Sequence, residues 1–111
     1  MIVWQKSMKL VSEIYKLTRL LPKEEIYGIT NQMRRAAVSI PSNIAEGYER
    51  ESKKDYTKFL YIAKSSRAEL ETQIYICIQE NYFTDEDAVT AFNLCLEIKR
   101  MLSTMIDKYK E

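Results

Sequence analysis

One apolar stripe runs past a proline between Ile26 and Tyr48, and it limits the possible folds more than any other feature. Apolar residues recur there at steps of three or four, namely Ile26, Ile29, Met33, Ala37, Ile40, Ile44 and Tyr48. This spacing is typical of one face of an α-helix. The stripe keeps its phase at Pro41, which predicts one helix kinked at Pro41 rather than two helices. The helix should begin between Lys23 and Thr30, and Gly47 should end it in a left-handed conformation.

Three further helices are expected from apolar spacing and from signals at helix ends. The spacing predicts a helix from Ile2 to Leu21, which ends there because the residue before Pro22 is disfavoured in helical geometry. Ser52 and Thr84 each stand three positions before an aspartate, a pattern typical of helix N-termini. Helices should therefore begin just after both residues. The first is expected to end near Asn81, and the second should continue to the end of the chain.

Together these helices predict one all-α domain over residues 1–111. The chain has only two glycines and two prolines, too few for a many-stranded fold with a turn about every 8–12 residues. Four helices joined by short loops predict an antiparallel up-down-up-down four-helix bundle. Trp4 and Asn43 should meet at one end and serve the structure. The amide of Asn43 is expected to bond backbone carbonyls that Pro41 leaves free.

Histidine is absent from the sequence, and this absence excludes several classes of enzyme. It removes nucleophiles activated by histidine, the carboxylate–histidine di-iron pattern of helical bundles and most transition-metal sites. Cys77 and Cys95 lie in helical patterns without metal-ligand spacing and are expected to be buried, reduced thiols. No apolar run is long enough for a membrane span, and the first residues do not resemble a secretory signal. We therefore expect a cytoplasmic, non-enzymatic protein without a metal or cofactor.

Glu46 and Glu49 offer the one enzymatic alternative. They form an ExxE pair, which helps to hold magnesium in some nucleotide pyrophosphatases built as helical bundles. A magnesium site needs several converging carboxylates, and Gly47 should end the helix between these two. A structural role for Glu46 is therefore preferred over a magnesium-dependent hydrolase.

Arg34 and Arg35 are adjacent, so their side chains diverge by about 100° around a helix. One of them is expected to form a bidentate pair with Glu69, at the middle of the bundle and opposite Arg67. The other would then be free to bind a phosphate. We assign Arg35 to the structural pair and Arg34 to the phosphate contact.

Charge is distributed unevenly along the chain. The net charge is +6 up to Arg67 and −5 from Ala68 onward, which gives +1 overall. A basic stripe at the start of the third helix would suit contact with a nucleic-acid backbone. The residues expected to make that contact are Arg34, Lys53, Lys54, Lys58 and Arg67. The same polarity also suits head-to-tail association of copies, and a solvated mixed face is the third possibility.

Several motifs along nearly the whole chain carry a family resemblance. They are Trp4-Gln5-Lys6, Leu21 to Glu25 with Tyr27-Gly28, Gln32, Arg34-Arg35-Ala36, Ser39-Ile40-Pro41, Asn43 to Gly47, Ile62-Ala63, Ser66, and Glu69 to Thr72. With them the chain resembles the 23S rRNA intervening-sequence proteins, a family of four-helix bundle proteins. Two departures are Ser65 and Asn81, which stand where the family usually has glycine.

This resemblance implies a bundle that assembles into a ring-shaped homopentamer. Some members are encoded within insertions in bacterial large-subunit rRNA genes. A related branch is the accessory protein of diversity-generating retroelements and binds nucleic acid and the reverse transcriptase through a positively charged ring. We expect a homo-oligomer that binds RNA or a nucleic-acid–protein complex weakly, because its net charge is lower than in that branch. The alternative is a scaffold that docks a protein partner without nucleic acid.

Overall fold

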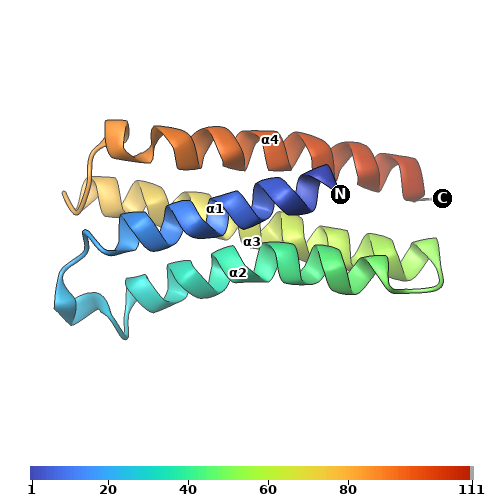
Figure 1. Ribbon diagram of the computed structural model, residues 1–111, viewed down its shortest axis with the longest axis horizontal. Coiled ribbons are helices and arrows are strands. Elements are labelled where there is room, and N and C mark those ends of the chain that lie inside the picture. Colours follow the sequence, from blue (N-terminus) through green and yellow to red (C-terminus); the bar gives the residue numbers. More distant parts are fainter. Residues whose placement is uncertain (111) are drawn as a thin grey trace.

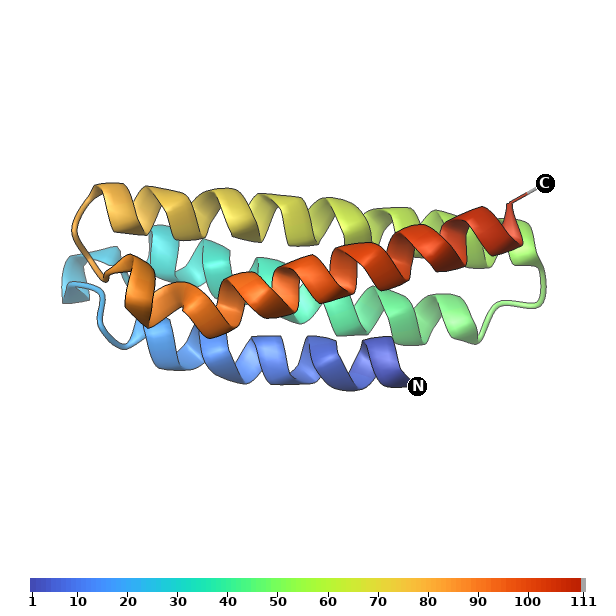
Figure 2. The same ribbon diagram turned by 90° about the horizontal axis from the view of Figure 1, so that it is seen from above.

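The computed structural model describes residues 1–110 as four α-helices joined by short connections (Figure 1). The elements are α1 (Ile2–Thr18), a 3-10 turn η1 (Lys23–Glu25), α2 (Ile29–Tyr48), α3 (Lys53–Gln79) and α4 (Asp85–Tyr109). Both α1 and α3 pack against α2 and α4, in a rod that measures 44 × 25 × 19 Å. Successive helices run in opposite directions in both views (Figures 1 and 2). The predicted all-α, antiparallel four-helix bundle is confirmed.

The first helix ends earlier than predicted, at Thr18 rather than at Leu21. The amides of Leu20 and Leu21 bond the carbonyls of Leu17 and Thr18, three residues back, so the chain tightens into a turn. This turn buries Leu21 and leaves Leu20 exposed. The apolar pattern could not separate this turn from a further helical turn, because both place an apolar side chain against the core.

The second helix passes through Pro41 without a break, as predicted, and Pro41 is buried within it. Asn43 does bond a backbone carbonyl, but the acceptor differs from the one expected. Its Nδ2 donates to the carbonyl oxygen of Ser39 at 2.8 Å and to the Ser39 hydroxyl at 3.0 Å. The carbonyl that Pro41 deprives of its helical partner belongs to Ala37, which lies on the buried face of the helix. The Asn43 side chain reaches one turn back instead.

Gly47 does not end the second helix in a left-handed conformation, and this prediction is wrong. The helix continues to Tyr48, and neither glycine has a positive φ. A Cβ atom on Gly47 would lie 2.6 Å from Cβ of Phe59, so the glycine is required for the close approach of α2 to α3. The left-handed residue is Asn81, with φ 63°.

Asn81 lies in the connection that ends the third helix. The amide of Tyr82 bonds the carbonyl of Cys77 at 2.9 Å, and the amide of Asn81 bonds the carbonyl of Ile78 at 3.0 Å. These two bonds form a Schellman motif. Asparagine can replace the glycine usual at this position, because its short polar side chain tolerates the left-handed conformation.

Both predicted helix starts are confirmed. The Ser52 hydroxyl accepts the amide of Asp55 at 3.1 Å, and α3 begins at Lys53. Thr84 forms a complete capping box with Asp87 at the start of α4. These bonds satisfy amide groups that have no partner within the helix.

Trp4, which was expected to serve the structure, does not lie in the core of the bundle. The core-facing residues of α1 are Val3, Ser7, Leu10, Ile14, Leu17 and Thr18, whereas Trp4 is 38% exposed and Met8 is also exposed. The helix carries two adjacent apolar stripes, and periodicity alone could not tell which of them faces the core. The second stripe, with Trp4 and Met8, borders the groove between α1 and α2.

Cys77 and Cys95 are both free and buried, and their predicted burial is confirmed. Burial raises the pKa of Cys77 to about 11 and that of Cys95 to about 12. No helix within residues 1–110 is long and apolar enough to cross a membrane.

Candidate nucleic-acid interface

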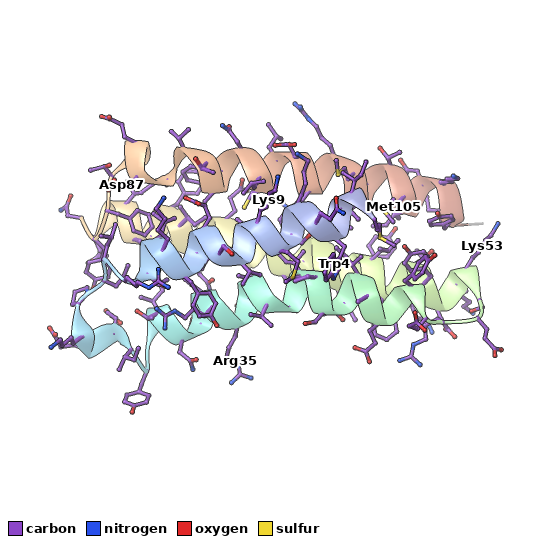
Figure 3. All side chains as sticks on the ribbon, viewed as in Figure 1. Trp4, Lys9, Arg35, Lys53, Asp87 and Met105 are labelled. Carbon is purple, nitrogen blue, oxygen red and sulfur yellow. The ribbon has the colours of Figure 1, made fainter. Side chains whose placement is uncertain are left out.

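The five residues expected to contact nucleic acid do not form one stripe. Lys53, Lys54 and Lys58 lie at the start of α3, at one end of the bundle, where Figure 3 labels Lys53. Arg34 lies early in α2, which runs antiparallel to α3, so it belongs to the half of the bundle nearer the opposite end. Arg67 is buried in the middle of α3. The positive charges therefore occupy separate regions.

Arg67 is only 5% exposed and cannot serve as a surface contact in this chain. Its Nη1 lies 3.5 Å from Oε1 of Glu71, one turn further along α3. Among residues 1–110, its Nε and Nη1 atoms have no hydrogen-bond partner. The guanidinium also acts on the thiol of Cys95, where its charge lowers the pKa that burial raises. Arg67 projects from the buried face of α3, which the sequence could not distinguish from an exposed one.

The lysines at the start of α3 are exposed beside a cluster of tyrosines. Lys58 lies 3.8 Å from Asp55, whereas Lys53 and Lys54 form no ion pair with a carboxylate in the described part of the chain. Tyr56 stacks on Tyr109, with ring centroids 5.3 Å apart, and meets Tyr48 edge to face at 6.1 Å. Burial raises the pKa of Tyr56, with neighbouring Tyr109 and Tyr48 as smaller causes.

Glu46 forms an exposed ion pair with Arg50, which follows the end of α2. Its Oε1 lies 3.5 Å from Nη2 of Arg50, and the Arg50 guanidinium lies over the Phe59 ring at 4.7 Å. Within residues 1–110, no group of three or more acidic, cysteine or histidine side chains could hold a metal ion.

Arg34 is held against α1 by two contacts. Its Nε donates to the Thr18 hydroxyl at 2.9 Å, and its guanidinium lies 4.7 Å from the centroid of the Tyr15 ring. The Thr18 hydroxyl in turn donates to the carbonyl of Ile14 at 2.7 Å. Neither Tyr15 nor Thr18 was predicted to hold an arginine. The only indication in the sequence was that Tyr15 and Thr18 are three residues apart and therefore lie on the same side of α1.

The predicted pair between Glu69 and one of the two arginines is wrong. Glu69 accepts from Nε2 of Gln73 at 3.3 Å, and Arg35 is exposed without an ion pair to any residue that the structure describes. Arg34 faces α1, whereas Glu69 projects from α3 on the other side of α2. The pair was predicted because Glu69 and the two arginines were expected at the same height along the bundle axis. That height does not determine the direction in which a side chain points.

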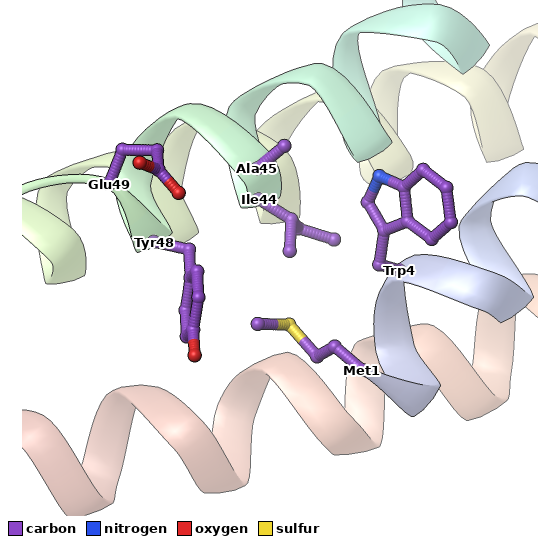
Figure 4. Close-up of a pocket in the computed structure, with 6 residues that line it drawn as sticks. All are labelled: Met1, Trp4, Ile44, Ala45, Tyr48 and Glu49. Atoms are coloured by element: carbon purple, nitrogen blue, oxygen red, sulfur yellow. The ribbon is translucent and has the colours of Figure 1, made fainter.

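Two exposed apolar surfaces lie on opposite sides of the bundle. The first, the α1–α2 groove, is lined by Trp4, Met8, Val11, Val38, Pro41 and Ala45. It continues into a cavity of about 490 Å³ beside Trp4, Ala45 and Tyr48 (Figure 4). The second, the α3–α4 surface, has Tyr75 against Phe92, with centroids 4.8 Å apart. Exposed Val89 and Leu96 lie one turn from Phe92 on the same face of α4.

Comparison with known proteins identifies the family. The sequence model of the 23S rRNA-intervening sequence proteins matches residues 1–104. The chain belongs to this family. A solved structure described as a protein of unknown function from the S23 ribosomal protein family of Bacteroides thetaiotaomicron is also similar. It has 28% sequence identity and a TM-score of 0.86, over 94% of this chain and 97% of that chain. No curated protein matched.

For this member of the 23S rRNA-intervening sequence protein family, exposed cations and apolar surfaces are the features that can recognise a partner. The cations lie at the start of α3 and around Arg34. The apolar surfaces lie on the α1–α2 and α3–α4 sides. A charged surface suits a polyanion, and an apolar surface suits another protein surface.

Proposed function

We propose that this protein is a non-enzymatic, cytoplasmic homo-oligomer that binds RNA weakly through exposed lysine and arginine side chains. The observation that carries the proposal is that Lys53 and Lys54 are exposed without carboxylate partners in residues 1–110. The half-buried Arg34 adds a third cation without a carboxylate partner. Cations of this kind neutralise phosphates and release counterions, which makes binding strongly dependent on salt. The family whose model the chain matches is named after 23S rRNA, and this name supports RNA as the ligand.

Self-association is the second part of the proposal. The α1–α2 groove and the α3–α4 surface differ in their residues and lie on opposite sides of the bundle. A contact between two different surfaces is heterologous, and it closes into a ring when the rotation between copies allows. The chain carries a net charge of +6 up to Arg67 and −5 beyond it. The charges of neighbouring copies joined in this way would therefore be complementary. The family resemblance suggests a ring of five.

The RNA proposal is tested by the binding of labelled single-stranded RNA at a series of salt concentrations. Wild type should bind at low salt, and the double variant Lys53→Gln/Lys54→Gln should bind more weakly with a shallower salt dependence. The matched control is Lys99→Gln/Arg100→Gln, which removes the same charge from the exposed side of α4 and should retain more affinity. Absence of binding by wild type at low salt would remove RNA from the proposal.

One observation favours a second function, a scaffold that docks a protein partner. The cavity beside Trp4 and Tyr48 is mainly apolar and opens at the surface. A partner bound there would be insensitive to salt and sensitive to Trp4→Ser. In that case the lysine variants would leave partner binding unchanged.

A further inference from the structure

Three cationic side chains line a hollow at the end of the α1–α2 pair. The hollow has a volume of about 370 Å³ and lies between the end of α1, the connection through η1 and the start of α2. Its charged lining residues are Arg19, Lys23 and Arg34, and no carboxylate from residues 1–110 lines it. In a protein with a net charge of only +1, this local excess of positive charge favours an anion.

Arg34 is oriented before any ligand arrives. Its Nε is bonded to the Thr18 hydroxyl, and the face of its guanidinium is held by the Tyr15 ring. Its two terminal amino groups make no hydrogen bond or ion pair within the described residues. A guanidinium fixed in this way loses little side-chain entropy when it binds a planar or tetrahedral anion with both amino groups.

Glu25, in the connection that borders the hollow, has both carboxylate oxygens engaged in hydrogen bonds. Oε2 of Glu25 accepts from the Tyr82 hydroxyl at 2.8 Å, and Oε1 accepts from the Ile29 amide at 3.4 Å. The bond to Glu25 raises the pKa of Tyr82 to about 12. Glu25 is thereby tied to the connection between α3 and α4. Thr30, in the first turn of α2, lies in the lining, where the positive end of the helix dipole adds to the field.

We propose that this hollow is a binding site for a phosphate group, with Arg34 as its anchor and Arg19 and Lys23 as additional cations. The inference rests on the proposed RNA binding for the source of the phosphate, which is the backbone of a single strand. A phosphate presents several acceptor oxygens on one compact group, so three donors can reach it together inside a hollow. A carboxylate from the start of α4 in a second copy is the competing occupant, and the experiment distinguishes the two.

The experiment compares Arg34→Gln with Arg35→Gln, because these neighbours lose the same charge and only Arg34 lines the hollow. Binding of a labelled single-stranded oligouridylate is followed by fluorescence anisotropy at low salt. Arg34→Gln should weaken binding by about tenfold or more, the loss expected for a charge-assisted hydrogen-bonded contact. Arg35→Gln should weaken it by less than about threefold. Arg34→Lys, which retains the charge, should also weaken binding because lysine cannot donate in bidentate geometry.

A second arm uses inorganic phosphate alone, followed by NMR. Phosphate should shift the resonances of the Arg34 Nε–H group and the Thr30 amide, and Arg19→Gln/Lys23→Gln should reduce those shifts. If wild type binds no RNA, the proposed function fails, and this arm alone decides the site: shifts support it and their absence overturns it. Equal RNA affinity of the Arg34 and Arg35 variants overturns the site and leaves RNA binding standing.

Sedimentation of the same variants addresses the competing occupant. If Arg34→Gln dissociates the oligomer, Arg35→Gln does not, and RNA affinity is unchanged, the hollow is a subunit contact and the proposal is overturned. Circular dichroism checks that each variant folds. Should Arg34→Gln fail to fold, the RNA affinities of Arg34→Lys and Arg19→Gln/Lys23→Gln decide the site in its place: weaker binding supports it, and unchanged binding overturns it.

Discussion

Gly47 on α2 lies against Phe59 on α3 so closely that a methyl group on the glycine would come within 2.6 Å of the Phe59 Cβ atom. The ring of Tyr56 lies next to the same point, 3.0 Å from the position of that methyl group. The Phe59 Cβ atom is bonded directly to the backbone of α3, so no side-chain rotation can move it away. The glycine thus allows α2 and α3 to pack closely where the two helices join.

Gly47→Ala should therefore destabilise the protein. Overpacking at a helix contact costs about 1–3 kcal/mol, which exceeds the gain of about 1 kcal/mol in helix propensity. Urea unfolding measures the difference. Ser42→Ala, on an exposed position of the same helix, is the control and should change stability by less than about 0.5 kcal/mol. A Gly47→Ala protein as stable as wild type would show that the helices can separate at no cost.

Two substitutions at Asn81 should have opposite effects on the stability of the protein. It has φ 63°, so Asn81→Ala should lower the free energy of unfolding by about 1 kcal/mol, because alanine is strained in this conformation. Asn81→Gly should equal or exceed wild type, because glycine adopts it freely. Thermal unfolding of the two variants gives the comparison. If alanine were tolerated as well as glycine, the Schellman motif would contribute little.

Arg67→Met should make the bundle more stable. Burial of a guanidinium with unpaired Nε and Nη1 atoms carries a desolvation cost that one contact to Glu71 does not offset. Replacing buried ionic groups by apolar residues of similar volume is often neutral or stabilising by about 1–4 kcal/mol. Arg67→Ala removes the side-chain volume as well and should destabilise through a cavity. A marked loss of stability in Arg67→Met would mean that the guanidinium makes an important interaction in the assembled protein.

The buried thiols should make stability decrease at alkaline pH. The pKa values of Cys77 and Cys95 are raised from an ordinary 9.0 to about 11 and about 12, so the folded protein holds these protons more tightly than the unfolded chain. The stabilisation is complete below pH 9 and is lost as the pH rises through this range, with a slope of up to about 1.4 kcal/mol per pH unit for each thiol.

Chemical denaturation at a series of alkaline pH values measures this slope. Cys95→Ala should be less stable at neutral pH because of its cavity, yet it should lose less stability than wild type between pH 9 and 12. If wild type and Cys95→Ala lost stability equally with rising pH, the assignment of this pH dependence to Cys95 would be contradicted.

A heterologous contact between copies predicts a specific mixing result. Met8→Glu places a charge in the α1–α2 groove, and Leu96→Glu places one on the α3–α4 surface, so each variant alone should fail to assemble. A mixture of the two retains one intact surface of each kind and should form dimers that stop at two copies. Sedimentation of the single variants and of the mixture gives the answer. If the Leu96→Glu variant assembled as wild type does, the α3–α4 surface would not take part in the contact between copies.

The secondary structure was largely predictable because its signals are local. Apolar spacing across Pro41 and the acceptor side chains of Ser52 and Thr84 act within one or two turns, so the sequence already contains them. The predicted Gly47 stop failed for a non-local reason. A glycine at a helix end and a glycine at a helix contact look alike until the position of Phe59 is known.

Signals local to each helix were enough to predict the all-α bundle, the four helices and two of their N-terminal caps, because hydrogen bonds and apolar periodicity along one helix set them. The packing of the four helices was needed to establish that Arg67 is buried, that Trp4 is exposed and that Arg34 turns toward Tyr15 and Thr18 rather than toward Glu69. Each of these depends on how a helix is rotated about its own axis. That rotation is set by the packing of neighbouring helices, because adjacent apolar stripes on one helix are nearly equivalent until the other three are in place.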